Sequence, residues 1–508
     1  MSLRRARVLT RSVVAAAAGL AMVGLIQVPA LGTSLGSSRD SPSTAPITGE
    51  DALRDAVDAI LDQPVLDGAT VSVIVRDART GETLYRRDPH TRLNPASNAK
   101  IFTSLAAMGT LGPRWRFRTD LLAPGAVRHG TLTSDVYLRG GGDPTLLQRD
   151  YERLASDLRE QGVRRIRGDV VADDHYFDQV PFGPGWAWDD TPYYYSAVTS
   201  GLTLAPDTDY DSGTVIVQAR PGTRVGARVR MSTHPSTGVL DFVVRGKTSK
   251  AGSRNTLSVE RAYGSNVVTV TGHMPLAGGR ELHWIPVPDP TAYAADVFTR
   301  ALHHQGIRAT GATVSGRTPA HADRLARHTS QTLATILTPF LKLSNNMHAE
   351  ALTKTMGRVE RGRGGWGPGT AVIRRYTRSI GVPTTTMRLW DGSGLSRFDL
   401  ISARTISDVL LAARDQPWFE TWYEALPVAC RKDRMVGGTL AYRMCGTTAA
   451  GNVHAKTGSL AAVSALSGYV TDAAGDPLVV SMLTSNVLRG NPGKLEDALA
   501  ETLAEWSP

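Results

Sequence analysis

The segment from about residue 118 to residue 287 separates two parts of the chain that have a different pattern. It carries short runs of β-branched and apolar residues divided by glycine-rich turns, such as TVIVQARPG from Thr214 and NVVTVTGHM from Asn266. Runs of this kind are typical of short strands. Because 508 residues exceed what one core needs, the pattern predicts an α+β domain in two parts, 48–117 and 288–508, split by β-rich inserted domains at 118–287.

Both flanking parts carry the helix and strand signals of a core. Apolar residues recur three to four positions apart in the predicted helices, and runs of valine, isoleucine and leucine mark the strands. The N-terminal part predicts a helix from Glu50, a hairpin from Val71 to Arg87 and a helix over 101–108 closed by Gly109. The C-terminal part predicts helices at 291–305, from Asn346 and around Leu499, with strands in NVHAKTG, VSALSGYV and LVVSMLTS.

The first 32 residues have the pattern of a signal peptide. Four arginines precede an apolar run from Val13 to Ile26, and Ala30 and Gly32 are small residues suited to cleavage. Residues 33–47 are rich in serine, proline, threonine and glycine and predict a linker. The protein is therefore predicted to be exported and extracytoplasmic, secreted or in the cell wall. An uncleaved membrane anchor is the alternative.

Export also bears on charge and on the cysteines. Without the four arginines of the signal peptide the net charge falls from +10 to +6. The remaining positive charge suits peripheral association with a polyanionic wall or a membrane, although ordinary solubility explains it equally well.

An oxidising compartment favours a disulfide between the only two cysteines, Cys430 and Cys445, with two free buried thiols as the alternative. No CxxC or HExxH is present, and no metal, cofactor or nucleic-acid partner is predicted.

The first of three short motifs pairs a serine with a lysine. A nucleophilic serine needs a base, a proton relay and donors for the developing oxyanion. In Ser97-Asn98-Ala99-Lys100 the two residues share one face of a helix, so the lysine amine can reach the serine hydroxyl. The start of a helix also favours a developing negative charge on Ser97. Lys100 is the only one of the eight lysines with a serine three residues before it.

The second motif is Lys456-Thr457-Gly458-Ser459, the only Lys-Thr-Gly triplet in the chain. Its lysine and two hydroxyls can bind a carboxylate, and the glycine lets a substrate backbone approach the strand edge.

The third motif, Ser-x-Asn, has two candidates between the other motifs. Ser253 and Asn255 lie in a stretch of glycine, serine and arginine that is typical of a surface turn. Ser344 and Asn346 lie between an apolar segment and a helix, where side chains can be held rigidly. We prefer Ser344 and Asn346, although Ser344 could simply be the N-cap of that helix.

The order SxxK, SxN, KTG resembles the penicillin-recognising serine enzymes. The segments RLNPASNAK, LRGGGDPTL, VADDHYFD, GPGWAWDD, LKLSNNMHAEAL, DGSGLSRFDLIS and HAKTGSL resemble the D-alanyl-D-alanine carboxypeptidase/endopeptidase family of class C low-molecular-mass penicillin-binding proteins, from about residue 50 to the C-terminus. The resemblance implies a penicillin-binding-protein/β-lactamase-like transpeptidase domain, an antiparallel sheet with helices, with β-rich domains inserted between the first two motifs. The sequence departs from the family between Cys430 and Cys445, where the disulfide would be an added brace.

The resemblance also implies a reaction, with peptidoglycan stem peptides as substrates and β-lactam antibiotics as acylating agents. Ser97 would attack the carbonyl of the penultimate D-alanine, with Lys100 as its base. Burial and the Lys456 cation are expected to lower the pKa of Lys100. Ser344 would relay the proton to the leaving group, and Asn346 would bind the substrate amide. The terminal carboxylate would be held by Lys456, Thr457 and Ser459, and the backbone amides of Ser97 and Ser459 would form the oxyanion hole.

Two charged residues indicate a further contact with substrate. Asp190 in WAWDD and Arg397 in DGSGLSR belong to segments that approach the active site in the family. An acid with an arginine would suit a zwitterionic side-chain end such as that of diaminopimelate. The alternative is that WAWDD and the tyrosines after it only pack.

Two other functions are alternatives. A class A β-lactamase is the nearest rival enzyme, but nothing after Ser97 resembles its ExxLN segment, and the chain is too long for one compact domain. From a different class, a wall-binding or β-lactam-sensing module would be acylated without turnover.

Overall fold

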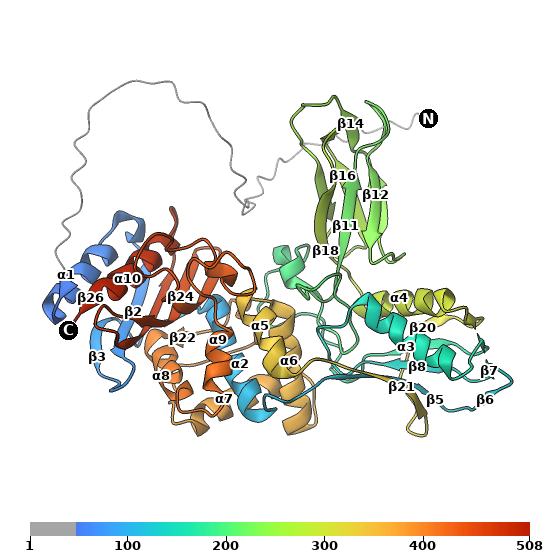
Figure 1. Ribbon diagram of the computed structural model, residues 1–508, viewed down its shortest axis with the longest axis horizontal. Coiled ribbons are helices and arrows are strands. Elements are labelled where there is room, and N and C mark those ends of the chain that lie inside the picture. The colour runs from blue at the N-terminus through green and yellow to red at the C-terminus, as the bar shows by residue number, and fades with distance from the viewer. Residues whose placement is uncertain (1–46) are drawn as a thin grey trace, which may run out of the picture. The chain divides into compact units, whose positions relative to one another are not determined.

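The computed structural model describes residues 47–508 (Figure 1). The predicted signal peptide at 1–32, and all of the predicted linker at 33–47 except its last residue, lie outside the described residues. Among the helices of the described part, none combines the length and the apolar character needed to cross a membrane.

One antiparallel sheet is built from both ends of the chain. β2 (Thr70–Asp77) and β3 (Thr83–Arg87) come from the N-terminal part, and β23 (His454–Leu460), β24 (Val463–Thr471) and β25 (Pro477–Ser485) come from the C-terminal part. The strand order is β23-β24-β25-β2-β3, with every neighbouring pair antiparallel. Pairing of β2 with β25 joins the two ends into one α+β domain.

Alternation along the strands divides the core between the two faces of this sheet. Val73 and Val75 pack with α1 (Glu50–Leu61) and α10 (Gly493–Glu505) on one face. Ile74 belongs to the core on the other face, which a larger helical layer covers. That layer contains α2 (Ala99–Thr110), α5 (Leu333–Lys342), α6 (Asn346–Arg361), α7 (Trp366–Ser379), α8 (Ala403–Ala413) and α9 (Phe419–Glu424).

The first inserted domain has a mixed sheet with two helices. Its strand order is β20-β10-β8-β5-β21. The helices α3 (Gln148–Glu160) and α4 (Pro290–His304) contribute Tyr151 and Phe298 to the hydrophobic core that also contains Leu121. The strands are β5 (Arg118–Ala123), β8 (Val136–Arg139), β10 (Val170–Asp173), β20 (Thr313–Ser315) and β21 (Asp323–Thr329).

The predicted boundary between residues 287 and 288 is wrong. β21 pairs with β5, β20 pairs with β10, and α4 packs into the same core as those strands. The inserted region therefore runs from residue 118 to about 329, and it contains helices as well as strands. The apolar periodicity of α4 predicts a helix, but it does not specify which core that helix joins.

The other longer elements of the insertion are short strands. In one sheet β11 (Thr214–Arg220) pairs with β12 (Arg230–His234) and β18 (Glu281–Pro286). In a second, β16 (Val267–Thr271) pairs with β13 (Asp241–Val244) and β15 (Ser258–Arg261). In a third, β14 (Lys247–Ser249) pairs with β17 (His273–Pro275). The other strands of the described part have two residues each: β1 (Ile47–Thr48), β4 (Arg92–Leu93), β6 (Val127–Arg128), β7 (Thr131–Leu132), β9 (Arg165–Ile166), β19 (Arg308–Ala309), β22 (Ile401–Ser402) and β26 (Trp506–Ser507). Short 3-10 helices lie at Pro64–Leu66, Ala96–Asn98, Trp188–Asp190, Tyr194–Ser196 and Gly438–Leu440.

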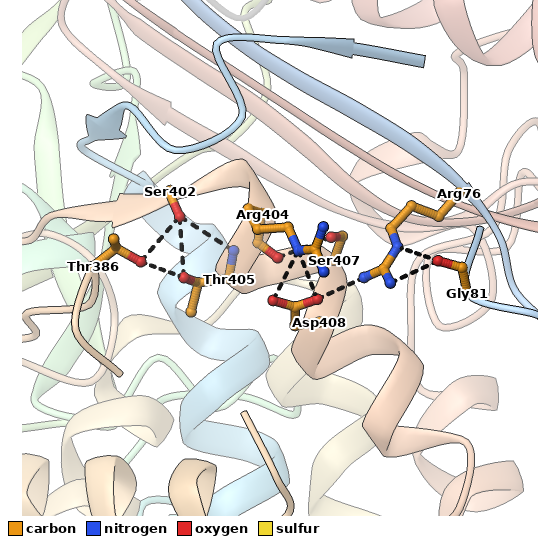
Figure 2. Close-up of polar contacts among 8 residues, drawn as sticks. All are labelled: Arg76, Gly81, Thr386, Ser402, Arg404, Thr405, Ser407 and Asp408. Atoms are coloured by element: carbon orange, nitrogen blue, oxygen red, sulfur yellow. Dashed lines mark hydrogen bonds and ion pairs between the residues drawn. The ribbon is translucent and has the colours of Figure 1, made fainter. Parts of the chain in front are cut away.

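A buried ion pair fixes α8 to the sheet (Figure 2). Arg76 of β2 is buried, and its Nη1 lies 2.6 Å from Asp408 Oδ1 on α8. The same guanidinium donates to the carbonyl of Gly81, and Arg404 Nε also donates to Asp408. At the start of α8 the hydroxyl of Ser402 caps the helix by accepting from the Thr405 amide.

Asp408→Ala is expected to lower the free energy of unfolding by about 3 kcal/mol, because a buried guanidinium loses its carboxylate partner. Chemical denaturation measures the change. The matched control is Asp51→Ala, which breaks the exposed pair of Asp51 with Arg54 and should cost less than about 1 kcal/mol. Equal losses in the two variants would contradict a structural role for the buried pair.

Candidate active site

Ser97 lies in a tight turn just before α2. The turn is a 3-10 helix, Ala96–Asn98, and Ala96 adopts a left-handed φ of 45°. Gly458 of β23 faces this turn, where an added Cβ would lie 2.7 Å from the carbonyl oxygen of Pro95. The glycine therefore lets β23 lie against the serine turn, a reason different from the predicted approach of a substrate backbone. Close packing of strand and turn fixes Ser97 next to the KTG strand.

Lys100 lies one helical turn after Ser97, fully buried among acceptors. Its Nζ is 2.8 Å from Ser97 Oγ, 2.6 Å from Asn346 Oδ1 and 2.8 Å from the carbonyl oxygen of Ser393. Burial lowers the pKa of Lys100 to about 7, against the opposing charges of Asp391 and Glu350. A large fraction of this amine is therefore neutral near pH 7, as a base requires.

Ser344 and Asn346 lie beside the two lysines of the other motifs. Ser344 has a left-handed φ of 58° between α5 and α6, and its Oγ accepts from Lys456 Nζ at 2.9 Å. Asn346 contacts Lys100 through Oδ1 and donates to the carbonyl of Tyr195 through Nδ2 at 2.7 Å. The N-cap of α6 is Asn345, not Ser344. A left-handed serine at this position is a strained conformation of the kind that clusters at functional sites.

The alternative Ser-x-Asn element lies elsewhere. Ser253 and Asn255 are exposed in the turn between β14 and β15, and the side chain of Asn255 caps the amide of Leu257. They contact neither lysine of the other motifs by a hydrogen bond in the described part of the chain.

The remaining KTG residues line the end of β23, the edge strand of the main sheet. Lys456 is fully buried, and its pKa is held well below the ordinary value by burial and by the charge of Lys100. Thr457 Oγ1 donates to Thr439 Oγ1 at 2.8 Å, and Ser459 is exposed. Two hydroxyls and an amine thus follow one another at a strand edge that an extended peptide can approach.

Asp190 and Arg397 form no hydrogen bond with the side chains of the three motifs in the described part of the chain. Each contacts a residue that lies beside them. Asp190 Oδ1 accepts from the Tyr195 hydroxyl at 2.9 Å, and Tyr195 contacts Asn346. Arg397 is exposed, and its Nη1 lies 3.4 Å from the carbonyl oxygen of Ala461, just after β23. Within residues 47–508 no hydrogen bond or ion pair joins Asp190 to Arg397. The structure places both at the edge of the site without pairing them.

Two buried carboxylates that the sequence analysis missed hold the backbone beside Lys100. Glu350 accepts from the amides of Gly392 and Ser393, both at 3.0 Å, and from the Trp366 indole. Its pKa is raised to about 7 by burial and by the charge of Asp391. These bonds fix the Ser393 carbonyl that accepts from Lys100. The sequence held a signal for Glu350, because this acid lies four residues after Asn346 and so shares its face of α6.

Asp391 is the second of these carboxylates. It accepts from the amides of Gly394 and Ser396 at 2.8 and 2.7 Å and from the Trp186 indole at 2.8 Å. An Asp followed by glycines and serines is typical of such a turn. The loop 391–396 is therefore held from within by Asp391 and from α6 by Glu350.

The predicted disulfide between Cys430 and Cys445 is confirmed, with the two Cα atoms 5.0 Å apart. It closes a loop that contains Thr439, the residue that contacts Thr457 of the KTG strand. The bridge therefore braces a segment that borders the site.

Comparison with known proteins identifies relatives along most of this chain. Residues 53–506 match the family described as D-Ala-D-Ala carboxypeptidase 3 (S13). The chain is 40% identical to the D-alanyl-D-alanine carboxypeptidase of Actinomadura sp. (strain R39), over 97% of this chain and 90% of that protein. It is 26% identical to the D-alanyl-D-alanine carboxypeptidase DacB of Haemophilus influenzae, over 82% of this chain and 85% of that protein.

A solved structure confirms the predicted fold class. Penicillin-binding protein 4 (dacB) from Haemophilus influenzae matches with a TM-score of 0.76 and 24% identity, over 88% of this chain and 98% of that chain. The sequence matches are long enough and similar enough to show the family as well as the fold. This chain belongs to the D-Ala-D-Ala carboxypeptidase 3 (S13) family.

Proposed function

We propose that this serine D-alanyl-D-alanine carboxypeptidase works through an acyl-enzyme on Ser97. The observation that carries the proposal is the buried Lys100 amine, 2.8 Å from Ser97 Oγ and with a pKa lowered to about 7. A neutral amine at that distance can take the serine proton as the oxygen attacks. The start of α2 adds its positive end to stabilise the charge that develops on Ser97.

The first half-reaction transfers the peptide to the enzyme. Ser97 Oγ forms a bond to the carbonyl carbon of the penultimate D-alanine, and its proton passes to Lys100 Nζ. The backbone amides of Ser97 and Ser459 stabilise the tetrahedral oxyanion. As the C–N bond breaks, Ser344 relays a proton to the leaving D-alanine amine. Water then hydrolyses the ester with the same groups and restores the Ser97 hydroxyl.

Lys456, Thr457 and Ser459 are proposed to bind the terminal carboxylate of the substrate. Lys456 loses its charge readily in the free enzyme, because it is buried near a second amine. A carboxylate that docks at the strand edge supplies the missing counter-charge and favours the ammonium form. The two hydroxyls complete the contacts.

Asn346 is proposed to bind the substrate amide as well as to hold the base. Both ends of its side-chain amide are engaged in the free enzyme, one with Lys100 and one with the Tyr195 carbonyl. Binding of substrate therefore exchanges the bond to Tyr195 for a bond to the peptide.

The Ser97 hydroxyl is also proposed to be acylated by β-lactam antibiotics. Penicillin-binding protein 4 of Haemophilus influenzae, which shares this fold, has been solved in complex with a β-lactam. The N-terminal pattern and the disulfide support action outside the cytoplasm. The substrates proposed there are peptidoglycan stem peptides and their cross-links.

Two measurements test the proposal together: intact mass after benzylpenicillin, and D-alanine release from a pentapeptide stem. Stoichiometric acylation without D-alanine release or cross-link cleavage would favour a sensing module.

Asp190 and Arg397 are proposed to recognise the zwitterionic end of the stem side chain. Within residues 47–508 Asp190 Oδ2 has no hydrogen-bond partner, and a cationic amine of the substrate would supply one. Each of Asp190→Ala and Arg397→Ala is expected to lower the preference for a zwitterionic over an N-acylated stem about tenfold, the effect of one charged hydrogen bond. Because the two residues do not touch, the double variant should lose about a hundredfold.

The preference is measured as the ratio of kcat/KM for the two peptides. Asp189→Ala is the matched control, since Asp189 is the exposed neighbour of Asp190. If the preference survives in both single variants, Asp190 and Arg397 only pack or solvate.

A further inference from the structure

A cleft lined by arginines lies at the start of β5 and the end of β21. These two strands connect the helical layer to the first inserted domain (Figure 1). The volume of the cleft is about 820 Å³. Seven guanidinium groups and only two carboxylates line it, a surplus of five positive charges. The arginines come from several segments of both the transpeptidase domain and the first inserted domain, so the fold rather than one basic run gathers them.

The two carboxylates of the cleft are already engaged. Asp120 is buried and pairs with Arg139 at 3.0 Å and with Arg327 at 2.6 Å. Asp173 accepts from the amides of Thr318 and His175 at 2.8 and 3.1 Å. Asp120 therefore pairs with two of the seven arginines, and in the described part of the chain Asp173 forms no ion pair with an arginine.

Five guanidinium groups therefore face the cleft without a carboxylate partner in the described part of the chain. Arg116 and Arg358 donate to backbone carbonyls only. Arg114, Arg118 and Arg317 make no side-chain hydrogen bond there. Like charges gathered in a cleft focus a positive potential that attracts anions.

The cleft is separate from the acyl-enzyme site. Lys100 lies in the first turn of α2 and Asn346 begins α6, whereas Arg114 follows the end of α2 and Arg358 lies in the last turn of α6. At 1.5 Å per residue, Arg358 lies roughly 18 Å along the helix axis from Asn346. A ligand in the cleft would not occupy the site of the reacting serine.

The positive lining extends in one direction. An adjoining hollow of about 360 Å³ shares His175, Tyr176 and Arg358 with the cleft and continues to Arg363. Its one carboxylate, Asp178, is paired with Lys354 at 2.8 Å. A hollow on another side shares His175 and Arg317 with the cleft, but Asp174 and Asp289 line it in addition to Asp178. The cationic groups therefore follow a track past Tyr176, whose ring lies 5.7 Å from the Arg358 guanidinium carbon. A track suits an extended ligand with several anions better than a single ion.

We propose that this arginine cleft binds a polyanionic chain through its oxyanions, either phosphodiesters or carboxylates. Guanidinium groups match both kinds of oxyanion in a planar, two-pronged geometry. Binding there would hold the enzyme on an anionic polymer of its surroundings while Ser97 remains free. The inference goes beyond the proposed reaction and does not depend on it.

The test measures binding of two fluorescent polymers, poly(glycerol phosphate) and poly-L-glutamate, by fluorescence polarisation with the whole protein at low and high salt. The cleft variant combines Arg118→Glu and Arg317→Glu. The control combines Arg254→Glu and Arg280→Glu and changes the net charge equally. Arg254 and Arg280 are exposed, Arg254 between β14 and β15 and Arg280 just before β18. D-alanine release from a small soluble peptide shows that both variants remain folded and active.

Wild-type protein is expected to bind at least one polymer, more weakly at high salt, and the cleft variant to bind it at least about tenfold more weakly. The control should stay close to wild type, and peptide hydrolysis should be unchanged in both. The polymer that binds identifies the oxyanion. The proposal is overturned if wild type binds neither polymer, if the cleft variant binds as wild type does, or if the control loses as much.

Discussion

The Ser97→Ala variant is expected to release D-alanine about a millionfold more slowly than wild type, because removal of a nucleophile abolishes the covalent route. Benzylpenicillin should add no mass to it. The fold should survive, since the hydroxyl contacts only Lys100 among the described side chains. D-alanine release and intact mass spectrometry measure the two effects, and thermal unfolding checks the fold.

Ser253→Ala provides the matched control, because Ser253 begins the competing Ser-x-Asn element and lies exposed in a turn. It should behave as wild type in both assays. A penicillin adduct that persists in Ser97→Ala would assign the nucleophile to another residue and refute the mechanism at its first step.

The three motifs could be singled out in the sequence because lysine is scarce in this chain. Only eight lysines are present, so one SxxK and one KTG could be recognised, and the structure places Lys100 and Lys456 around Ser97 and Ser344. Short motifs succeed here since the helix turn and the strand edge set their internal geometry locally.

Contacts that depend on packing could not be predicted from local pattern. Gly109 is the next-to-last residue of α2, which ends at Thr110, and an added Cβ would lie 1.9 Å from the Tyr376 ring. Glycine in that helix permits close approach of α7, which a pattern of caps does not reveal. The misplaced boundary at residue 288 has a similar cause, because α4 and β21 join the inserted core only through long-range pairing.

The carboxylates behind Lys100 escaped prediction for a further reason. Glu350 and Asp391 are 41 positions apart, and each is satisfied chiefly by backbone amides of one loop. Backbone partners leave no side-chain pattern in the sequence. A single acid on a buried helix face and an Asp followed by glycines and serines were the available signals. They indicate burial and a turn without naming the partners.

Lys100→Met is expected to slow acylation by about ten-thousandfold, because a side chain of similar length replaces the base with an apolar group. In the wild type only the neutral amine accepts the serine proton, so the rate should rise with pH through the pKa of about 7 and level off above it. The Met variant should lose this limb of the pH profile. Acylation rates with benzylpenicillin across the pH range give both readouts. A variant with a normal limb would exclude Lys100 as the base.

Glu350→Gln separates charge from position at the same site. The negative charge of Glu350 raises the pKa of Lys100, so its removal should move the rising limb to lower pH. Glu360→Gln is the matched control: it changes the same residue type on the same helix, but Glu360 lies near the end of α6 and pairs with Arg375. That variant should leave the limb in place. If Glu350→Gln lowers the rate equally at every pH and the limb does not move, Glu350 supports the loop mechanically and does not set the charge state of the base.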